Sequence, residues 1–366
     1  MLDALRTLPK VVLHDHLDGG LRPATTLELA SAIGHALPAD DPDSLGAWFV
    51  SAASAGSLPA FLETFAHTVA CLQTEEALAR AAREAVVDHA RDGVIYAEIR
   101  YAPEMHLERG LTMERVVEAV QAGLDEGVQE AHGEGREIRA AALLTAMRHE
   151  HRSAEVARLA LATRGRCCVG FDIAGPEAGF PPSLHAEAFA LLRDGLFPAT
   201  IHAGEAAGVE SIAEAVGLGS ARRIGHGLRI LDDVIGADTE APSFGPVASF
   251  MRDNRIPLEL CPTSNVQTGA AASVATHPIT VLRDLGFAVT INPDNRLMCG
   301  TSQTREMGHL VEEAGWGLHD LELAALEAAW GAFQPYDVRQ EVADAVISGF
   351  LDAHEGEAAS GQGSGA

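Results

Sequence analysis

Basic side chains are scarce in this 366-residue sequence, which has 26 lysines and arginines against 52 aspartates and glutamates and a formal net charge of −26. Affinity for nucleic acid rests on basic groups that neutralise phosphates, so a chain this acidic would repel a phosphate backbone. The composition therefore argues against nucleic acid as a partner and disfavours phosphorylated substrates.

Cysteine and long apolar runs are also sparse. The five cysteines are odd in number and show neither a CxxC pair nor the spacing of a disulfide framework. Although 47% of the residues are hydrophobic, no apolar run reaches the roughly 18 residues that span a membrane. The first residues, MLDALRTLPKVV, lack the pattern of an export signal. We expect reduced thiols, a cytoplasmic location and no membrane partner.

Short apolar or β-branched runs alternate with longer helical patterns along the chain. Most runs are apolar on both faces, as in VIYAEIRYAP, which is typical of parallel strands covered by helices. Eight such alternations predict an α/β fold of the (β/α)₈ TIM barrel type. The predicted strands are Lys10–His16, Val94–Pro103, Ile138–Met147, Cys168–Gly175, Pro198–Glu205, Arg223–Gly227, Pro257–Asn265 and Ala288–Asn295.

The gap between the first and second predicted strands is much longer than one crossover helix requires. It carries helical patterns near 26–33, 45–52, 58–71 and 75–91, so we expect a helical insertion over the barrel mouth. Its aromatic residues could wall a pocket, although ordinary helix packing explains each of them equally well. These residues are Trp48, Phe49, Phe61 and Phe65.

The C-terminal region predicts extra helices near 306–313, 318–330 and 338–354. The last residues are small, polar and rich in glycine, a composition typical of disorder. We therefore expect a single domain over residues 1–354 and a disordered tail over residues 355–366.

The motif HDHLDG places His14 and His16 two residues apart on a predicted strand, so their side chains project to the same side. Alone, this pair is weak evidence for a metal site. More candidates stand at the C-terminal ends of other predicted strands, where barrel enzymes keep catalytic groups: His202 in TIHAGE, His226 in RIGHG and Asp294 in TINPDN. Imidazole nitrogens with one carboxylate suit a catalytic zinc, which keeps a position open for water.

Ordered blocks over almost the whole chain resemble the adenosine deaminases of the metal-dependent amidohydrolase superfamily, particularly their bacterial branch. The blocks are HDHLDGGLRP, RYAPE, LLTAMRH, FDIAG, HAGE, GHG, CPTSN and DNRLM. The resemblance implies hydrolysis of adenosine and 2′-deoxyadenosine to inosine and 2′-deoxyinosine plus ammonia, with one zinc ion per chain. It assigns the metal ligands to His14, His16, His202 and Asp294.

The resemblance also implies catalytic roles for Glu205 and His226. Glu205 matches the acid that protonates ring nitrogen N1 and so makes the adjacent C6 electrophilic. Such an acid must be protonated when substrate binds, which requires a pKa raised by burial or by a nearby anion. His226 matches the histidine that orients and helps deprotonate the zinc-bound water.

Four residues are expected at the purine nucleoside by the same resemblance: His16, Asp18, Gly175 and Asn295. Gly175 would present its amide to purine N3, where the missing side chain permits close approach. Asp18 would contact a sugar hydroxyl; adenine deaminases have glutamate in this block, so the short acid favours a nucleoside. Asn295 replaces the second aspartate of the wider family's NTDD motif, which meets purine N7, and its amide donates there at any pH.

Pro293, in the same motif, stands where threonine is usual and stiffens the backbone before a proposed ligand. His149, in a family-like MRH block, is expected to support the pocket rather than bind metal, whereas the role of His151 stays open. Cys261 is expected to pack in the core. The sequence does not indicate an oligomeric state.

Two other interpretations remain open. One is a deaminase of a modified aminopurine nucleoside, such as a menaquinone-pathway or secondary-metabolite compound, which pocket shape would decide. The other is a catalytically silent paralogue that only binds a nucleoside. Such a paralogue would be expected to lose Glu205 or His226 before losing its fold, and both are present.

Overall fold

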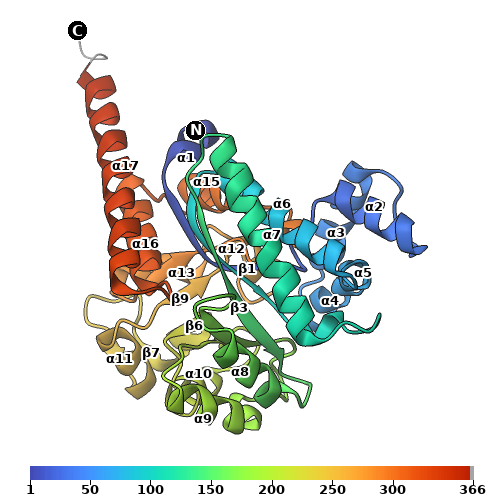
Figure 1. Ribbon diagram of the computed structural model, residues 1–366. Helices are drawn as coiled ribbons and strands as arrows, with labels where there is room; N and C mark the ends of the chain where they lie inside the picture. Colours follow the sequence, from blue (N-terminus) through green and yellow to red (C-terminus); the bar gives the residue numbers. More distant parts are fainter. Residues whose placement is uncertain (363–366) are drawn as a thin grey trace.

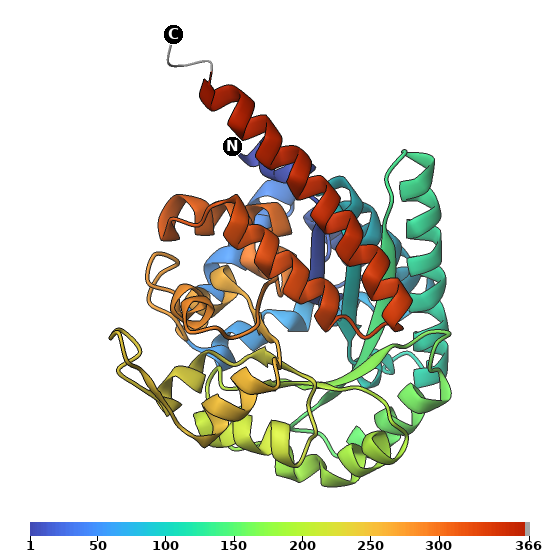
Figure 2. The ribbon, with the colours of Figure 1, turned by 90° about the vertical axis from the view of Figure 1, so that its left-hand side faces the viewer.

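The computed structural model describes residues 1–362, with side chains up to residue 355. Eight parallel strands form a barrel surrounded by helices (Figures 1 and 2). Each predicted strand run contains one barrel strand, so the predicted (β/α)₈ barrel is confirmed. The barrel strands are β1 (Lys10–His16), β2 (Val94–Tyr101), β3 (Arg139–Met147), β4 (Gly170–Ala174), β5 (Thr200–Ala203), β6 (Arg223–His226), β9 (Leu258–Leu260) and β10 (Val289–Ile291).

Two seams join the sheet β1–β2–β3–β4 to the sheet β10–β9–β6–β5 and close the barrel. At the first seam, the Phe171 amide donates to the Pro198 carbonyl over 3.1 Å. At the second, the Asp294 amide donates to the His14 carbonyl over 3.0 Å, and the His16 amide donates to the Asp294 carbonyl over 2.7 Å. Closure between β10 and β1 therefore places the HDH motif directly against the NPDN motif.

Charged side chains fill the interior of the barrel, where each is fully buried. Arg223 donates to Glu98 over 2.7 Å and to Glu259 over 2.5 Å. Arg100 donates to Glu259 over 2.6 Å and to Asp172 over 3.1 Å. Buried charges are tolerated when they are paired and hydrogen-bonded, as these are. The network extends to the C-terminal ends of the strands, where the candidate site lies.

Helices coat the outside of the barrel, and α7 (Met113–Gly133) shows how the sequence forms them. The Thr112 side chain caps the helix by accepting from the Arg115 amide over 3.3 Å, a position where threonine is favoured. A close approach of α6 (Glu75–Arg91) depends on Gly123, because a Cβ there would lie 2.1 Å from the Ala79 carbonyl. The other outer helices are α8 (Ser153–Ala162), α9 (Ala186–Asp194), α10 (Val209–Gly217), α11 (Pro246–Asp253) and α13 (Pro278–Asp284).

The long β1–β2 connection is helical, as predicted, and projects to one side of the barrel in Figure 1. The pattern over 58–71 forms two helices rather than one, separated at Thr64, whose hydroxyl donates to the Phe61 carbonyl over 2.7 Å. The helices of the insertion are α2 (Pro23–Ile33), α3 (Pro42–Ala53), α4 (Leu58–Glu63), α5 (Phe65–Cys71) and α6.

Short elements lie in the loops that follow several of the other barrel strands. They are η1 (Pro103–His106), η2 (Pro182–His185), η3 (Leu228–Asp233), β7 (Val234–Ile235), β8 (Ser243–Phe244), α12 (Pro262–Gln267) and α14 (Arg296–Cys299).

The C-terminal helices are α15 (Gln303–Ala314), α16 (Leu318–Gly331) and α17 (Tyr336–Gln362). At the N-terminus, the short helix α1 (Leu2–Thr7) comes before β1. α17 continues to Gln362, beyond the predicted helix end at 354 and into the segment expected as a tail. The rest of that expected tail, 363–366, lies outside the described residues. Within the described part of the chain, no helix has the length and apolarity needed to cross a bilayer.

Candidate active site

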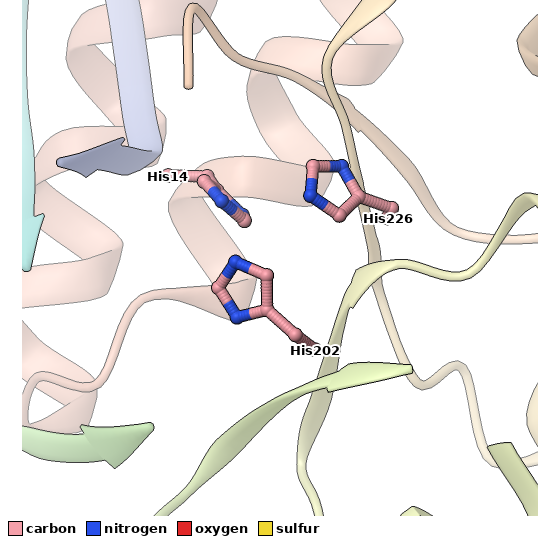
Figure 3. Close-up of side chains that lie close together, drawn as sticks. All are labelled: His14, His202 and His226. Atoms are coloured by element: carbon pink, nitrogen blue, oxygen red, sulfur yellow. The ribbon is translucent and has the colours of Figure 1, made fainter. Parts of the chain in front are cut away.

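Three histidines from three different strands meet at the C-terminal end of the barrel. His14 lies near the C-terminal end of β1, His202 lies on β5, and His226 is the last residue of β6. The ring centroids are 4.7 Å apart for His14 and His202 and 4.8 Å apart for His14 and His226. Figure 3 shows the three imidazoles turned toward a common space. The barrel thus brings His14 next to His226, although the two residues lie more than 200 positions apart in the chain.

The other two predicted ligands, Asp294 and His16, join this group. Asp294 Oδ1 lies 3.2 Å from His14 Nε2 and 3.4 Å from His16 Nε2. The His16 and His202 ring centroids are 5.3 Å apart. The structure therefore brings all four predicted ligands to one place.

At the centre of this group, His14 Nε2 and Asp294 Oδ1 lie 3.2 Å apart, but no hydrogen bond joins them. Among the described residues, His14 Nε2 and Asp294 Oδ1 are buried and make no hydrogen bond. The other carboxylate oxygen of Asp294 accepts from the Ser264 hydroxyl over 2.5 Å. A buried nitrogen and a buried carboxylate oxygen without partners are costly unless a cation binds between them. The donor set fits a divalent metal of the zinc type.

Carboxylates hold the outer ring nitrogens of two of these histidines. His14 Nδ1 lies 2.9 Å from Glu259 Oε2, and His202 Nδ1 lies 3.0 Å from Asp172 Oδ1. Both carboxylates are tied to Arg100. Such contacts set the tautomer and direct the inner nitrogen, Nε2, toward a metal. His202 and Arg100 bring the pKa of Asp172 down to about 2 against the opposing effect of burial, so this carboxylate stays ionised.

His14 also belongs to two other groupings that could hold a metal, one with His202 and His226 and one with Cys261 and Asp294. Burial raises the pKa of the Cys261 thiol well above its usual value. Its Sγ donates to the Glu259 carbonyl over 3.6 Å. A neutral, hydrogen-bonded thiol is a poor ligand, which agrees with the prediction that Cys261 packs in the core.

Glu205 lies in the loop after β5 and is only 7% exposed. Burial raises the pKa of its carboxyl group, although His226 partly opposes this. Its Oε1 atom accepts from the Thr268 hydroxyl over 3.0 Å, and its Oε2 atom lies 3.6 Å from His226 Nε2. The raised pKa is what a proton-donating acid needs near neutral pH.

The backbone is in the left-handed region at two residues of this group. His226 has φ 63° and Asp294 has φ 60°. Residues other than glycine rarely adopt this conformation, and each instance costs on the order of 1–3 kcal/mol. The surrounding barrel holds both residues in it, and both side chains face the same centre.

A cavity of about 610 Å³ opens above the histidines. Phe61 and Phe65 line it, as expected for a pocket wall formed by the insertion. Trp48 and Phe49 do not; they pack against each other with ring centroids 5.1 Å apart, which corrects that part of the expectation. The four predicted substrate-binding residues all line the cavity: His16, Asp18, Gly175 and Asn295.

Local geometry explains why glycine occupies position 175 in the cavity wall and position 19 behind Asn295. Gly175 has φ 104°, and a Cβ there would lie 3.2 Å from His149 Nδ1, so His149 backs the cavity wall as predicted. Asn295 Oδ1 is buried against Gly19, where a Cβ would lie 1.9 Å away. Burial raises the pKa of Asp18, also on the wall, to about 6.

Sequence reasoning missed the residues that support this site. Asp172, Glu259 and Arg100 are fully buried on β4, β9 and β2, strands composed largely of apolar residues. A charged residue inside such a strand is itself a signal, because it must be paired in the barrel interior. Their partners, however, come from strands distant in the sequence and are set only by the fold.

The family model for adenosine deaminase matches residues 9–349. Among curated proteins, the chain is 54% identical over 346 residues to adenosine deaminase 1 of Streptomyces coelicolor, covering 94% of this chain and 87% of that protein. It is 51% identical over 348 residues to an adenosine deaminase of Mycobacteroides abscessus, covering 94% and 96%. An amidohydrolase from Burkholderia ambifaria, solved with bound zinc, superposes with a TM-score of 0.83 at 22% identity, covering 98% of this chain and 94% of that one.

Proposed function

The chain belongs to the adenosine deaminase family, and on that basis we propose that it uses one zinc ion to hydrolyse adenosine and 2′-deoxyadenosine to inosine and 2′-deoxyinosine plus ammonia. Deamination of adenosine follows from the extent of identity to the curated adenosine deaminases. The metal, the use of the 2′-deoxynucleoside and the residue roles are the added content of the proposal.

One observation carries the proposal. His14 Nε2 and Asp294 Oδ1 are buried and make no hydrogen bond, and Asp294 lines the same cavity as His16, His202 and Glu205. Three of the four proposed metal ligands and a buried acid with a raised pKa thus face one cavity of about 610 Å³. Attack at C6 needs a nucleophile on one side and a proton donor to the ring, and this arrangement supplies both.

His14, His16, His202 and Asp294 would hold the zinc ion. Bound there, zinc would lower the pKa of a water molecule and so provide a nucleophile at neutral pH. The bound zinc of the Burkholderia ambifaria amidohydrolase supports this choice of metal. The chain's own contribution is to hold Nε2 of His14 and of His202 in place through Glu259 and Asp172 at the opposite ring nitrogens.

Glu205 would donate its proton to purine N1, which draws electron density from C6. Because burial raises the pKa of this carboxyl, the protonated form persists closer to neutral pH than for an exposed glutamate. The Thr268 hydroxyl, 3.0 Å from Oε1, holds the carboxyl group in one orientation.

His226 would orient the attacking water. Asn265 Nδ2 lies 3.1 Å from His226 Nδ1, and the amide donates there, so neutral His226 carries its proton on Nε2. From Nε2, which lies 3.6 Å from Glu205 Oε2, it would donate a hydrogen bond to the attacking water. This contact supports the orienting part of the predicted role more directly than deprotonation of the water.

The remaining cavity residues would position the nucleoside. Gly175 would offer its amide to N3, Asn295 its side-chain amide to N7, and Asp18 its carboxyl group to a sugar hydroxyl. The apolar wall formed by Phe61 and Phe65 would exclude water from the purine.

The test is ammonia release by the zinc-loaded protein with adenosine, 2′-deoxyadenosine, adenine, AMP and a 5′-modified adenosine, beside a chelator-treated control. Rapid, metal-dependent turnover of the two unmodified nucleosides is expected. Turnover of the 5′-modified compound alone would instead support a modified nucleoside as the substrate. Equal rates after chelation, with metal absent by elemental analysis, would contradict the zinc assignment.

A further inference from the structure

Glu177 lies two residues beyond Gly175, in the loop after β4, and is 3% exposed. Among the described residues, its carboxylate forms no ion pair with a lysine, arginine or histidine side chain. It accepts hydrogen bonds from the main chain around Glu205: Oε1 accepts from the Gly204 amide over 2.6 Å, and Oε2 accepts from the Glu205 amide over 3.1 Å.

Three more donors complete this environment. Oε2 also accepts from the Ala206 amide over 2.6 Å and the Ala207 amide over 2.9 Å, and Oε1 accepts from the Ser211 hydroxyl over 2.7 Å. Four consecutive amides therefore converge on one carboxylate. Hydrogen bonds to an ionised acceptor are the stronger kind, and a carboxylate that accepts several of them stays ionised.

The contact joins two loops that reach the cavity from neighbouring strands. The β4 loop carries Gly175 and the β5 loop carries Glu205, and both residues line the cavity. In the proposed function these residues meet N3 and N1, which are separated by a single ring carbon. A displacement of one loop relative to the other would change both contacts at once.

We propose that Glu177 is a positioning residue for Glu205: by holding the amides of residues 204–207, it fixes the proton donor relative to Gly175 and thus to the purine ring. This inference rests on the proposed function. Glu177 also lines the cavity, but both of its carboxylate oxygens already accept from these amides, so we assign it a role through Glu205 and not a direct contact with the purine. Its ionised side chain also adds to the raised pKa of Glu205.

Glu177→Gln tests the proposal, because glutamine keeps the size of the side chain but turns an NH₂ group toward main-chain donors. We expect kcat to fall about 100-fold, the scale of a misplacement of about 1 Å, with little change in KM. In a Glu205→Gln background the same substitution should change kcat less than about twofold, since residues that act as a unit are not additive. An equal fall in both backgrounds would overturn the proposal.

Hydrogen exchange gives a readout that does not depend on turnover. Glu177→Gln should raise amide exchange at residues 204–207 in the zinc-loaded protein, and unchanged protection there would also overturn the proposal. Asp233→Asn is the matched control, because Asp233 accepts from the Val247 and Ala248 amides at the start of α11, away from the cavity. It should leave kcat unchanged.

Ser211→Ala provides a milder variant if Glu177→Gln does not fold. It removes one donor to Glu177 and should lower kcat a few fold in the wild-type background, again without effect in Glu205→Gln. Failure of wild-type protein to deaminate adenosine, or full activity of Glu205→Gln, would instead contradict the proposed function. In either case the exchange experiment would still decide whether Glu177 holds the loop.

Discussion

Asn265 donates its side-chain amide to His226, with Nδ2 lying 3.1 Å from Nδ1. The orientation of this amide is set by Asn265 Oδ1, which accepts from the Cys261 main-chain amide over 3.1 Å, a group that can only donate. His277 Nε2 lies 3.2 Å from the same oxygen. The tautomer of His226 is therefore determined by a residue on the short helix after β9.

Replacing Asn265 with leucine would remove this control. We expect kcat to fall by about 10- to 100-fold, because a positioned catalytic histidine typically contributes about 10²–10⁴ in rate, while KM and zinc content change little. Steady-state kinetics and elemental analysis measure these quantities. Unchanged kcat would mean that the contact does not orient His226. Loss of metal would instead place Asn265 in support of the metal site.

Glu205→Gln and His202→Ala separate proton donation from metal binding. Glutamine cannot supply a carboxyl proton, so we expect Glu205→Gln to keep its zinc and lose about 10²–10⁴ in kcat. His202→Ala removes a proposed ligand and should lose both zinc and activity. Full activity in Glu205→Gln would eliminate the role as proton donor, and full zinc occupancy in His202→Ala would remove that residue from the ligand set.

Asp172 and Glu259 should control zinc affinity although neither faces the cavity centre. Substitution of a carboxylate that orients a metal-bound histidine typically costs about 10- to 100-fold in affinity. We therefore expect Asp172→Asn and Glu259→Gln each to raise the zinc dissociation constant by this factor in a competition titration with a chelator. The charge-paired surface residue Asp232, which accepts from Arg229, offers a control in Asp232→Asn. Equal affinities in all four proteins would contradict the prediction.

Lys10 is the only lysine of the sequence, and it should make stability depend on pH. Burial is the largest cause that lowers its pKa from 10.5 to about 7, and Nζ donates to the Arg6 and Leu8 carbonyls. The unfolded chain keeps this proton up to about pH 10.5, whereas the folded chain releases it near pH 7. Unfolding between these values takes up a proton, so the lysine's contribution to stability rises with pH.

Comparison with Lys10→Met isolates this effect. The difference in free energy of unfolding, wild type minus variant, should increase by up to about 1.4 kcal/mol per pH unit between pH 7 and 10, and denaturant titrations at several pH values measure it. Reductive ¹³C-methylation followed by NMR would report the titration of this single side chain directly. A constant difference across this range would contradict the lowered pKa.

The sequence alone was sufficient for the barrel and for the identity of the residues at its centre. Strand–helix alternation is a local property, and apolar strands between amphipathic helices have few ways to bury their surfaces. His14, His202 and Asp294 could be chosen because parallel strands deliver their C-terminal residues to one face of a barrel.

Other features depended on the tertiary structure. The pairing of Asp172 with His202, the carboxylate of Glu177 beneath the Glu205 loop and the amide of Asn265 at His226 all join segments between 28 and 39 residues apart. The sequence shows a buried acid or amide but not its partner. The partner is decided by strand register, loop path and the requirement that each buried polar group find a hydrogen bond, and these are satisfied only when the barrel closes.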